Sequence, residues 1–419
     1  MIIEQVRFYI FLRDVFLLSL TTFGGPQAHL AHFQKVLVSK RKYLSDEDLM
    51  EINSLCQVIP GPTSTQTLTA IGFKIGGPNL AYLTLLVWVL PAVTLMTLAA
   101  VMMSSIEQNN ISIEFTRFIQ PMAVGFVSYG AYSISQKTIS TKTGIVLMIF
   151  AGATSYFFQT PFIFPVIILG SGLITALKYK AQPKEENKKI IVPWSNFLLW
   201  AGVLIFAAVV GGITKALPVK VFENFYRNGS LVFGGGQVLA PLLYTEFVDA
   251  SPGDDRITKV TELKTKIKKK FGPKLYHAPI SNDEFLTGYA VAQALPGPVF
   301  SFSSYIGALS MRGYGKGSAL IGGLMAAAGI FLPGTFLIFF VIRFWESLKK
   351  YRAVRASLEG ITAASAGLVA ASAIILFQPL DNTFMNFAVT ILTFCLLAFT
   401  KLPSPFIVVG GLALGFIIH

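Results

Sequence analysis

Long runs of apolar residues, separated by short polar and basic stretches, dominate the chain. Clear examples occupy 80–103, 194–217, 321–342 and 386–400. Several of these runs reach the about 20 residues that a helix needs to cross a bilayer. The composition agrees, because only 13% of the 419 residues are charged, whereas soluble domains carry about 25%. The pattern therefore predicts an all-α polytopic membrane protein.

The apolar pattern occurs twice along the chain, and short motifs mark the repeat. The residues Phe-Gly-Gly-Pro-Gln at 23–27 return as Phe-Gly-Gly-Gly-Gln at 233–237, an offset of 210 (233 − 23). The residues Pro-Gly-Pro at 60–62 return at 296–298, an offset of 236 (296 − 60). The offset grows within a polar insertion at about 249–282, which the first half lacks. An ordered series of matches predicts two homologous halves.

Each half contains six apolar elements, and one unmatched apolar segment lies between the halves. This divides the chain into an N-terminal repeat (1–180), a linker with one transmembrane helix (181–221) and a C-terminal repeat (222–419). Because six is even, the single linking span places the second half in inverted topology, an arrangement common among secondary transporters. The elements lie near 8–35, 48–75, 79–104, 117–135, 143–159 and 161–179, and near 222–247, 283–310, 316–343, 355–377, 383–400 and 403–418.

The distribution of Lys and Arg favours one topology over another. If all thirteen segments span, 24 of the 34 basic residues lie on the side of the N-terminus. If the first two elements of each half, which Gly and Pro interrupt, re-enter instead, the count is 20 of 34. Basic residues concentrate in cytoplasmic loops, so we predict thirteen spans in the inner membrane. The N-terminus is then cytoplasmic and the C-terminus extracytoplasmic.

The basic insertion accounts for part of the net charge of +13. Its apolar residues Val260, Leu263, Ile267 and Phe271 alternate with lysines at the spacing of an amphipathic helix on an anionic membrane surface. A solvated cytoplasmic loop fits equally well. No aromatic and basic face accompanies the charge, so we expect no nucleic-acid partner.

The Gly-Pro interruptions predict a binding site for an anion. Proline removes a backbone N–H and breaks a helix, and a broken helix within a bilayer must face protein or a water-filled cavity. Where a half-helix restarts, its free N–H groups and positive dipole end attract anions. Kinks used only for helix packing are the simpler alternative. We expect substrate contacts from Gly24, Gly25, Gln27, His29, Gln57, Gly61, Thr63, Gly234, Gly235, Gly236, Gln237, Gln293, Gly297 and Ser301.

Charged residues at membrane depth are candidates for a substrate path or for ion coupling. The candidates are Arg13, Asp14 and Glu51. The alternative for Arg13 is a structural role, in which it pairs with the neighbouring Asp14 or extends to the membrane interface. His29 and His32 are three residues apart but lack a third ligand nearby, so we expect no metal and no cofactor.

The motifs around residues 23–62 and 233–298 resemble those of the chromate ion transporter family. They include the basic patch before Tyr43, Gln57 leading into Pro-Gly-Pro, and Phe-Leu-Thr-Gly-Tyr at 285–289. The similarity covers about residues 10–419, as in the long two-domain members. It implies export of chromate, a tetrahedral dianion similar to sulfate, across the inner membrane.

The expected function is therefore a secondary transporter of chromate or a related oxyanion, driven by the proton gradient or the membrane potential. A passive oxyanion channel is the main alternative. A membrane enzyme is less favoured, because the sequence shows no nucleophile and base set. Besides the oxyanion and the lipid bilayer, protons and a second copy of the chain stay open as partners.

Overall fold

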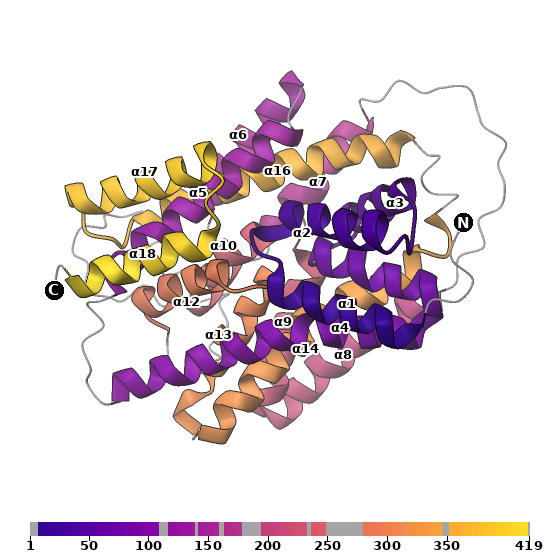
Figure 1. Cartoon of the computed structure of the whole chain (residues 1–419), viewed down its shortest axis with the longest axis horizontal. Helices are drawn as coiled ribbons and strands as arrows, with labels where there is room; N and C mark the ends of the chain where they lie inside the picture. Colours follow the sequence, from indigo (N-terminus) through magenta and orange to yellow (C-terminus); the bar gives the residue numbers. More distant parts are fainter. Residues whose placement is uncertain are drawn as a thin grey trace.

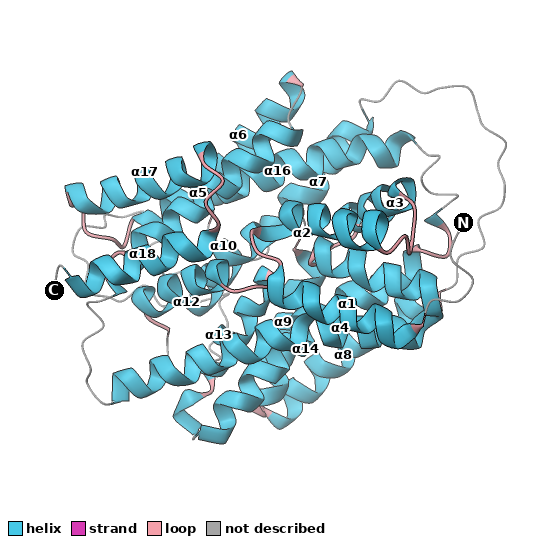
Figure 2. Ribbon diagram, in the orientation of Figure 1, coloured by secondary structure: helices cyan, strands magenta, loops and turns pink. Residues whose placement is uncertain are grey.

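A computed structural model describes residues 7–108, 116–138, 141–158, 163–177, 194–232, 236–248, 280–314, 316–345 and 352–417. These residues form helices joined by short loops (Figures 1 and 2), and their one β-contact is an isolated bridge between Val248 and Ile280. The basic insertion and its predicted surface helix lie outside the described residues.

The helices follow the predicted elements, but several are shorter. The first half and linker contain α1 (Phe8–Thr21), α2 (Gly25–Phe33), the π-helix η1 (Gln34–Lys40), α3 (Asp46–Val58), α4 (Thr63–Gln108), α5 (Ile119–Thr138), α6 (Lys142–Phe157), α7 (Ile163–Leu177) and α8 (Ser195–Thr214). The rest contains α9 (Leu217–Leu231), α10 (Gly236–Phe247), α12 (Asn282–Ala294), η3 (Val299–Ser301), α13 (Phe302–Ser310), η4 (Arg312–Tyr314), α14 (Lys316–Val341), α16 (Arg352–Phe377), α17 (Phe384–Phe399) and α18 (Ser404–Ile417).

The described chain is an integral membrane protein by its helices and its surface. Four helices are long and apolar enough to cross a bilayer: 63–106, 195–214, 317–341 and 356–377. The linking helix α8 exposes large apolar side chains, with Phe206 70% and Ile213 77% exposed. Such a surface is suited to lipid rather than to water.

In the first half, the elements that carry the Gly-Pro breaks fold back on themselves. The Arg41 Nε atom lies 2.7 Å from the Asp14 Oδ2 atom, although a continuous helix would separate these residues by about 40 Å. The Lys74 Nζ atom lies 2.5 Å from the Asp48 Oδ1 atom, where a continuous helix would again require about 39 Å. We call α1 with α2 and η1 the first hairpin, and α3 with residues 63–75 the second.

The second half repeats this arrangement. The Arg227 Nη2 atom lies 2.6 Å from the Glu246 Oε1 atom, which joins α9 and α10 into the third hairpin. The Arg312 guanidinium pairs with the Glu284 carboxylate, which joins the start of α12 to the end of α13 in the fourth. Each hairpin therefore has a carboxylate on one arm that pairs with a cation on the other side of its break.

The prediction of thirteen spans is wrong for these four elements. A hairpin has both of its ends on one side, so it enters a membrane without crossing it. The count of Lys and Arg compared only the loops on the two sides of the membrane. It contains no information on contacts between the two ends of one element, such as Asp14 with Arg41.

The outer ends of the second and fourth hairpins start in the same way. Ser45 caps α3 in a capping box with Asp48, and Ser281 caps α12 in a capping box with Glu284. Both pairs are 236 residues apart, the offset of the Pro-Gly-Pro motifs. After the second hairpin, Gly77 with φ of 73° breaks α4, a conformation that glycine adopts without strain. Residues 78–108 then continue as one long helix.

The tips of the hairpins meet inside the protein. The N–H of Gly61 donates to the carbonyl oxygen of Val232 at 2.7 Å, and the N–H of Gly297 donates to that of Thr22 at 2.9 Å. Each bond joins the Pro-Gly-Pro tip of one half to the break of the other half. In Figure 1, α1–α3 lie to the right of the centre and α10, α12 and α13 to the left, with α9 near the middle.

A cysteine at Glu47 distinguishes hairpins from spans. Glu47 is exposed in the first turn of α3, so the hairpins place it on the side of Lys142, whereas thirteen spans place it on the side of Thr214. We expect Glu47→Cys, in a chain without Cys56 and Cys395, to react with an impermeant maleimide from the same face as Lys142→Cys. Reaction from the face of Thr214→Cys would contradict the hairpins.

Candidate functional site

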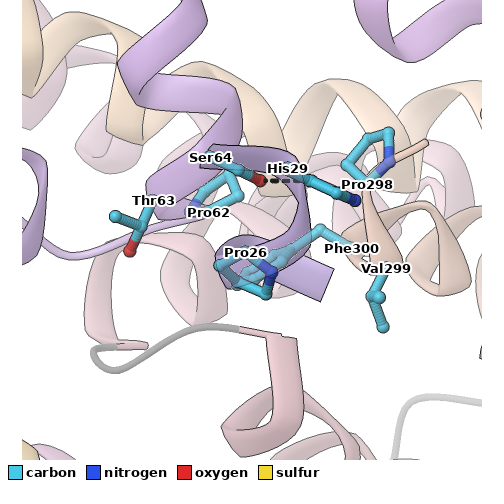
Figure 3. Close-up of a pocket in the computed structure, with 8 residues that line it drawn as sticks. All are labelled: Pro26, His29, Pro62, Thr63, Ser64, Pro298, Val299 and Phe300. Carbon is cyan, nitrogen blue, oxygen red and sulfur yellow. Dashed lines mark hydrogen bonds between the residues drawn. The ribbon is translucent and has the colours of Figure 1, made fainter. Parts of the chain in front are cut away.

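A small recess of about 10 Å³ lies where the hairpin tips converge (Figure 3). It combines the start of α2, the start of α4 and the segment after the second Pro-Gly-Pro motif. Its lining residues are Pro26, His29, Pro62, Thr63, Ser64, Pro298, Val299 and Phe300.

His29 is the one titratable side chain among these lining residues. It is 1% exposed, and its Nδ1 atom lies 3.0 Å from the Ser64 Oγ atom. The indole of Trp88 packs against the imidazole with ring centroids 5.5 Å apart, and Trp88 Nε1 donates to Thr65 Oγ1 at 3.1 Å. The His29 Nε2 atom is buried and has no partner among the described residues. A buried polar atom without a partner is costly, so this nitrogen is suited to a ligand.

Two helix N-termini open into the recess without side-chain caps. The N-cap of α2 is Gly24, which makes no side-chain hydrogen bond to the helix, and the residue before α4 is Pro62, which has no acceptor in its side chain. The first N–H groups of a helix have no partner within it, and its dipole makes this end positive. The starts of α3 and α12, in contrast, are capped by Ser45 and Ser281. The starts of α2 and α4 lack such caps, so their N–H groups are available to an anion.

Glycine is required at the two Pro-Gly-Pro tips. Gly61 has φ of 121° and Gly297 has φ of 101°, in the region that other residues adopt only with strain. A Cβ atom on Gly61 would lie 2.8 Å from Gln66 Nε2 and 3.3 Å from the Cα of Gly334. The tips therefore depend on a residue without a side chain, which allows the two halves to approach each other closely.

The structure brings some predicted site residues together and leaves others apart. His29 and Thr63 line the recess, while Gly24, Gly25, Gly61 and Gly297 form the breaks next to it. Gln57 and Gln293 lie in the last turns of α3 and α12 and do not line the recess. Ser301 is buried at the end of η3, one residue beyond the lining residue Phe300. Gly236 begins α10, whereas Gly234, Gly235 and the side chains of Gln27 and Gln237 lie outside the described residues.

The charged candidates do not form part of the recess. Arg13 is 52% exposed, and its Nη2 atom is 4.0 Å from Asp14. Asp14 instead binds Arg41 and accepts a hydrogen bond from the Tyr43 hydroxyl at 2.7 Å. Burial, with this hydrogen bond, raises the pKa of Tyr43, and the hydrogen bond to Asp14 raises the pKa of Arg41. Asp14 therefore stabilises the first hairpin, and Glu51 on α3 does not line the recess.

Three residues of the site were missed by the sequence reasoning. Val299 and Phe300 form the wall opposite His29 (Figure 3), and their position directly after Pro-Gly-Pro was the available signal. Trp88 packs on His29 from the long part of α4. Nothing in the local sequence distinguishes it from an ordinary apolar residue of a membrane helix.

The helices and the apolar surface define a polytopic membrane protein. The chain belongs to the chromate transporter family, whose sequence profile matches residues 10–176 and 270–416.

Named relatives match over most of their length. A probable chromate transport protein of Synechococcus elongatus is 26% identical over 92% of this chain and 89% of its own. A chromate transport protein of Cupriavidus metallidurans is 24% identical over 95% of this chain and 90% of its own. A chromate transport protein of Pseudomonas aeruginosa is 22% identical over 86% of this chain and 79% of its own. No solved structure matches the chain.

Proposed function

We propose that the protein exports chromate, or a related tetrahedral oxyanion such as sulfate, across the inner membrane. The observation that carries this proposal is the recess itself, where the uncapped starts of α2 and α4 meet the unpartnered Nε2 atom of His29. The names of the relatives support chromate as one substrate. The recess supplies the chemistry that such an ion needs.

A buried anion needs several converging donors, because an unpaired charge in an apolar medium is costly. The first turn of α4 offers the N–H groups of Thr63, Ser64 and Thr65, and that of α2 offers those of Gly25 and Gln27. Among the residues that the structure describes, no lysine or arginine lines the recess. Neutral donors and helix dipoles bind an anion less strongly than a fixed cation does, which suits a carrier that must also release its substrate.

We further propose that the halves are inverted repeats and that each contributes two hairpins and four spans, with α8 as the additional span. Each half then has an even number of spans, four instead of the six predicted from the sequence. The single additional span α8 therefore still inverts the second half and places the two termini on opposite sides of the membrane. The matched capping boxes and the reciprocal bonds of Gly61 and Gly297 support this relation. Hairpins that enter from opposite sides and meet at their tips place the anion between two gates, as alternating access requires.

Transport by purified protein in liposomes tests the proposal. We expect uptake of labelled chromate and sulfate against their concentration gradient when a proton gradient or membrane potential is imposed, and loss of this uptake with ionophores. Uptake only down the gradient would favour the passive channel. Proteoliposomes that take up neither ion under any gradient would contradict the proposed function.

A further inference from the structure

The polar wall of the recess comes from two different hairpins, so it needs a common support. The start of α2 belongs to the first hairpin and the start of α4 to the second. At about 10 Å³ the recess has room for about one water molecule, whereas a tetrahedral oxyanion has four oxygen atoms. The walls must therefore separate when the ion binds. The two helix starts keep their relative position during this movement only if a contact outside the recess holds them together.

Trp88 provides such a contact. Its side chain is fully buried and lies in the long part of α4, beyond the break at Gly77. The indole packs against His29 and Phe33 of α2, with ring centroids 5.5 Å apart in both pairs. Its Nε1 atom donates a hydrogen bond to the Oγ1 atom of Thr65, in the first turn of α4, at 3.1 Å. An indole N–H can only donate, so the direction of this bond is fixed.

One side chain therefore joins both helix starts to the same long helix. That helix is itself packed tightly against the second hairpin, because Thr84 leaves no room for a Cβ atom on Gly72. His29 also contacts the start of α4 directly, with its Nδ1 atom 3.0 Å from the Ser64 Oγ atom. The indole fixes the imbedded imbalance of neither start alone: it fixes the position of the imidazole relative to the first turn of α4.

A comparison of the two halves separates this role from ordinary helix packing. The Leu-Pro pairs of α4 and α14 match at an offset of 242 (332 − 90), which places Ile330 (88 + 242) at the position of Trp88. The position of His29 is occupied by Leu239 (29 + 210). Packing between matched helices would apply to both halves. The tryptophan instead occurs in the half that has the histidine.

We propose that Trp88 is a positioning residue that holds the starts of α2 and α4 in register, so that their donors converge on one anion. This inference rests on the proposed function, because it concerns the same site. Trp88 does not line the recess and acts through its contacts with His29 and Thr65.

Trp88→Phe tests this role, because it removes the indole N–H and keeps an aromatic ring. In proteoliposomes we expect the half-saturating chromate concentration to rise ~2- to 10-fold, the effect of one hydrogen bond, at a nearly unchanged maximal rate per inserted protein. Thr65→Val should have a similar effect. The double variant should show no further rise, because both changes remove the same bond.

The matched control is Trp200→Phe. The Nε1 atom of Trp200, on α8, donates to the Oγ atom of Ser230, on α9, at 3.0 Å, so this variant loses the same kind of bond away from the recess lining. We expect it to keep the half-saturating concentration of the unchanged protein. Additive effects of Trp88→Phe and Thr65→Val, or a loss confined to the maximal rate or the amount of protein, would overturn the inference. Thr65→Val leaves the ring packing in place and decides the question if Trp88→Phe does not insert.

Tryptophan emission gives a readout that does not depend on transport. We expect sulfate to change the emission of the purified protein in a saturable way, and this change to persist in Trp200→Phe and to disappear in Trp88→Phe. A change that persists in Trp88→Phe, or no change in the unchanged protein, would contradict the inference. Sulfate binding seen in this way, without transport of any oxyanion, would overturn the proposed function alone. Transport with unchanged half-saturating concentrations in Trp88→Phe and Thr65→Val would overturn this inference alone.

Discussion

Replacement of Gly61 or Gly297 by valine is expected to reduce transport to background while the protein still inserts. Both glycines have positive φ angles, which cost a β-branched residue about 1–3 kcal/mol. The new side chain of Gly297→Val would also start 3.0 Å from the Cβ of Ala92. Either change displaces a tip and weakens its bond to the other half. We expect at least ~10-fold lower transport from the strain and a larger loss from the misplaced helix ends.

The matched control is Gly212→Val on α8. Gly212 is exposed and has no atom within 4 Å of a built Cβ, so the change should be near neutral. Transport rates are compared after the amount of protein in the membrane is measured. Normal rates in both tip variants would mean that the breaks serve packing and that the anion binds elsewhere.

Replacement of His29 by leucine, the residue at the equivalent position 239 (29 + 210) of the second half, is expected to weaken substrate binding strongly. The change removes the buried Nε2 atom, which has no partner among the described residues, and the partner of Ser64. A hydrogen bond to a charged group contributes about 1.5–3 kcal/mol, which corresponds to roughly 10- to 150-fold in affinity. The measurement is the half-saturating chromate concentration in proteoliposomes.

His32→Leu provides the control for His29. It lies one turn along α2, is half-buried and does not line the recess. We expect it to keep the half-saturating concentration of the unchanged protein. Equal effects of the two variants would indicate a general disturbance of α2, and no effect of His29→Leu would remove His29 from the site.

Local sequence features were enough to predict the helical class and the breaks. Apolar runs gave the elements, and proline and glycine marked where the helices stop, because their effects on the backbone are local. His29 and Thr63 were identified for the same reason, since they follow a break closely.

The hairpins could not be predicted in this way. They depend on contacts such as Asp14 with Arg41, which are distant in sequence. A signal was nevertheless present, because Ser45 with Asp48 and Ser281 with Glu284 have the spacing of capping boxes. Two such helix starts, 236 residues apart, indicate where the motif-bearing helices begin.

Val299, Phe300 and Trp88 show a second limit of sequence reasoning. The site is asymmetric: α4 contributes Thr63 and Ser64 where the second half has these two apolar residues. A search for polar residues in both halves therefore favoured Gln57 and Gln293, which the fold places at the ends of α3 and α12 and not among the lining residues.

The most direct test of the account is to locate a bound oxyanion. Selenate is a suitable probe, because selenium scatters X-rays anomalously and the ion carries no proton near neutral pH. In crystals of the protein grown with selenate, we predict an anomalous peak within hydrogen-bond distance of the His29 Nε2 atom, beside the first turns of α2 and α4. A peak beside a cation outside the recess, such as Arg41 or Arg227, with no peak at His29, would contradict it.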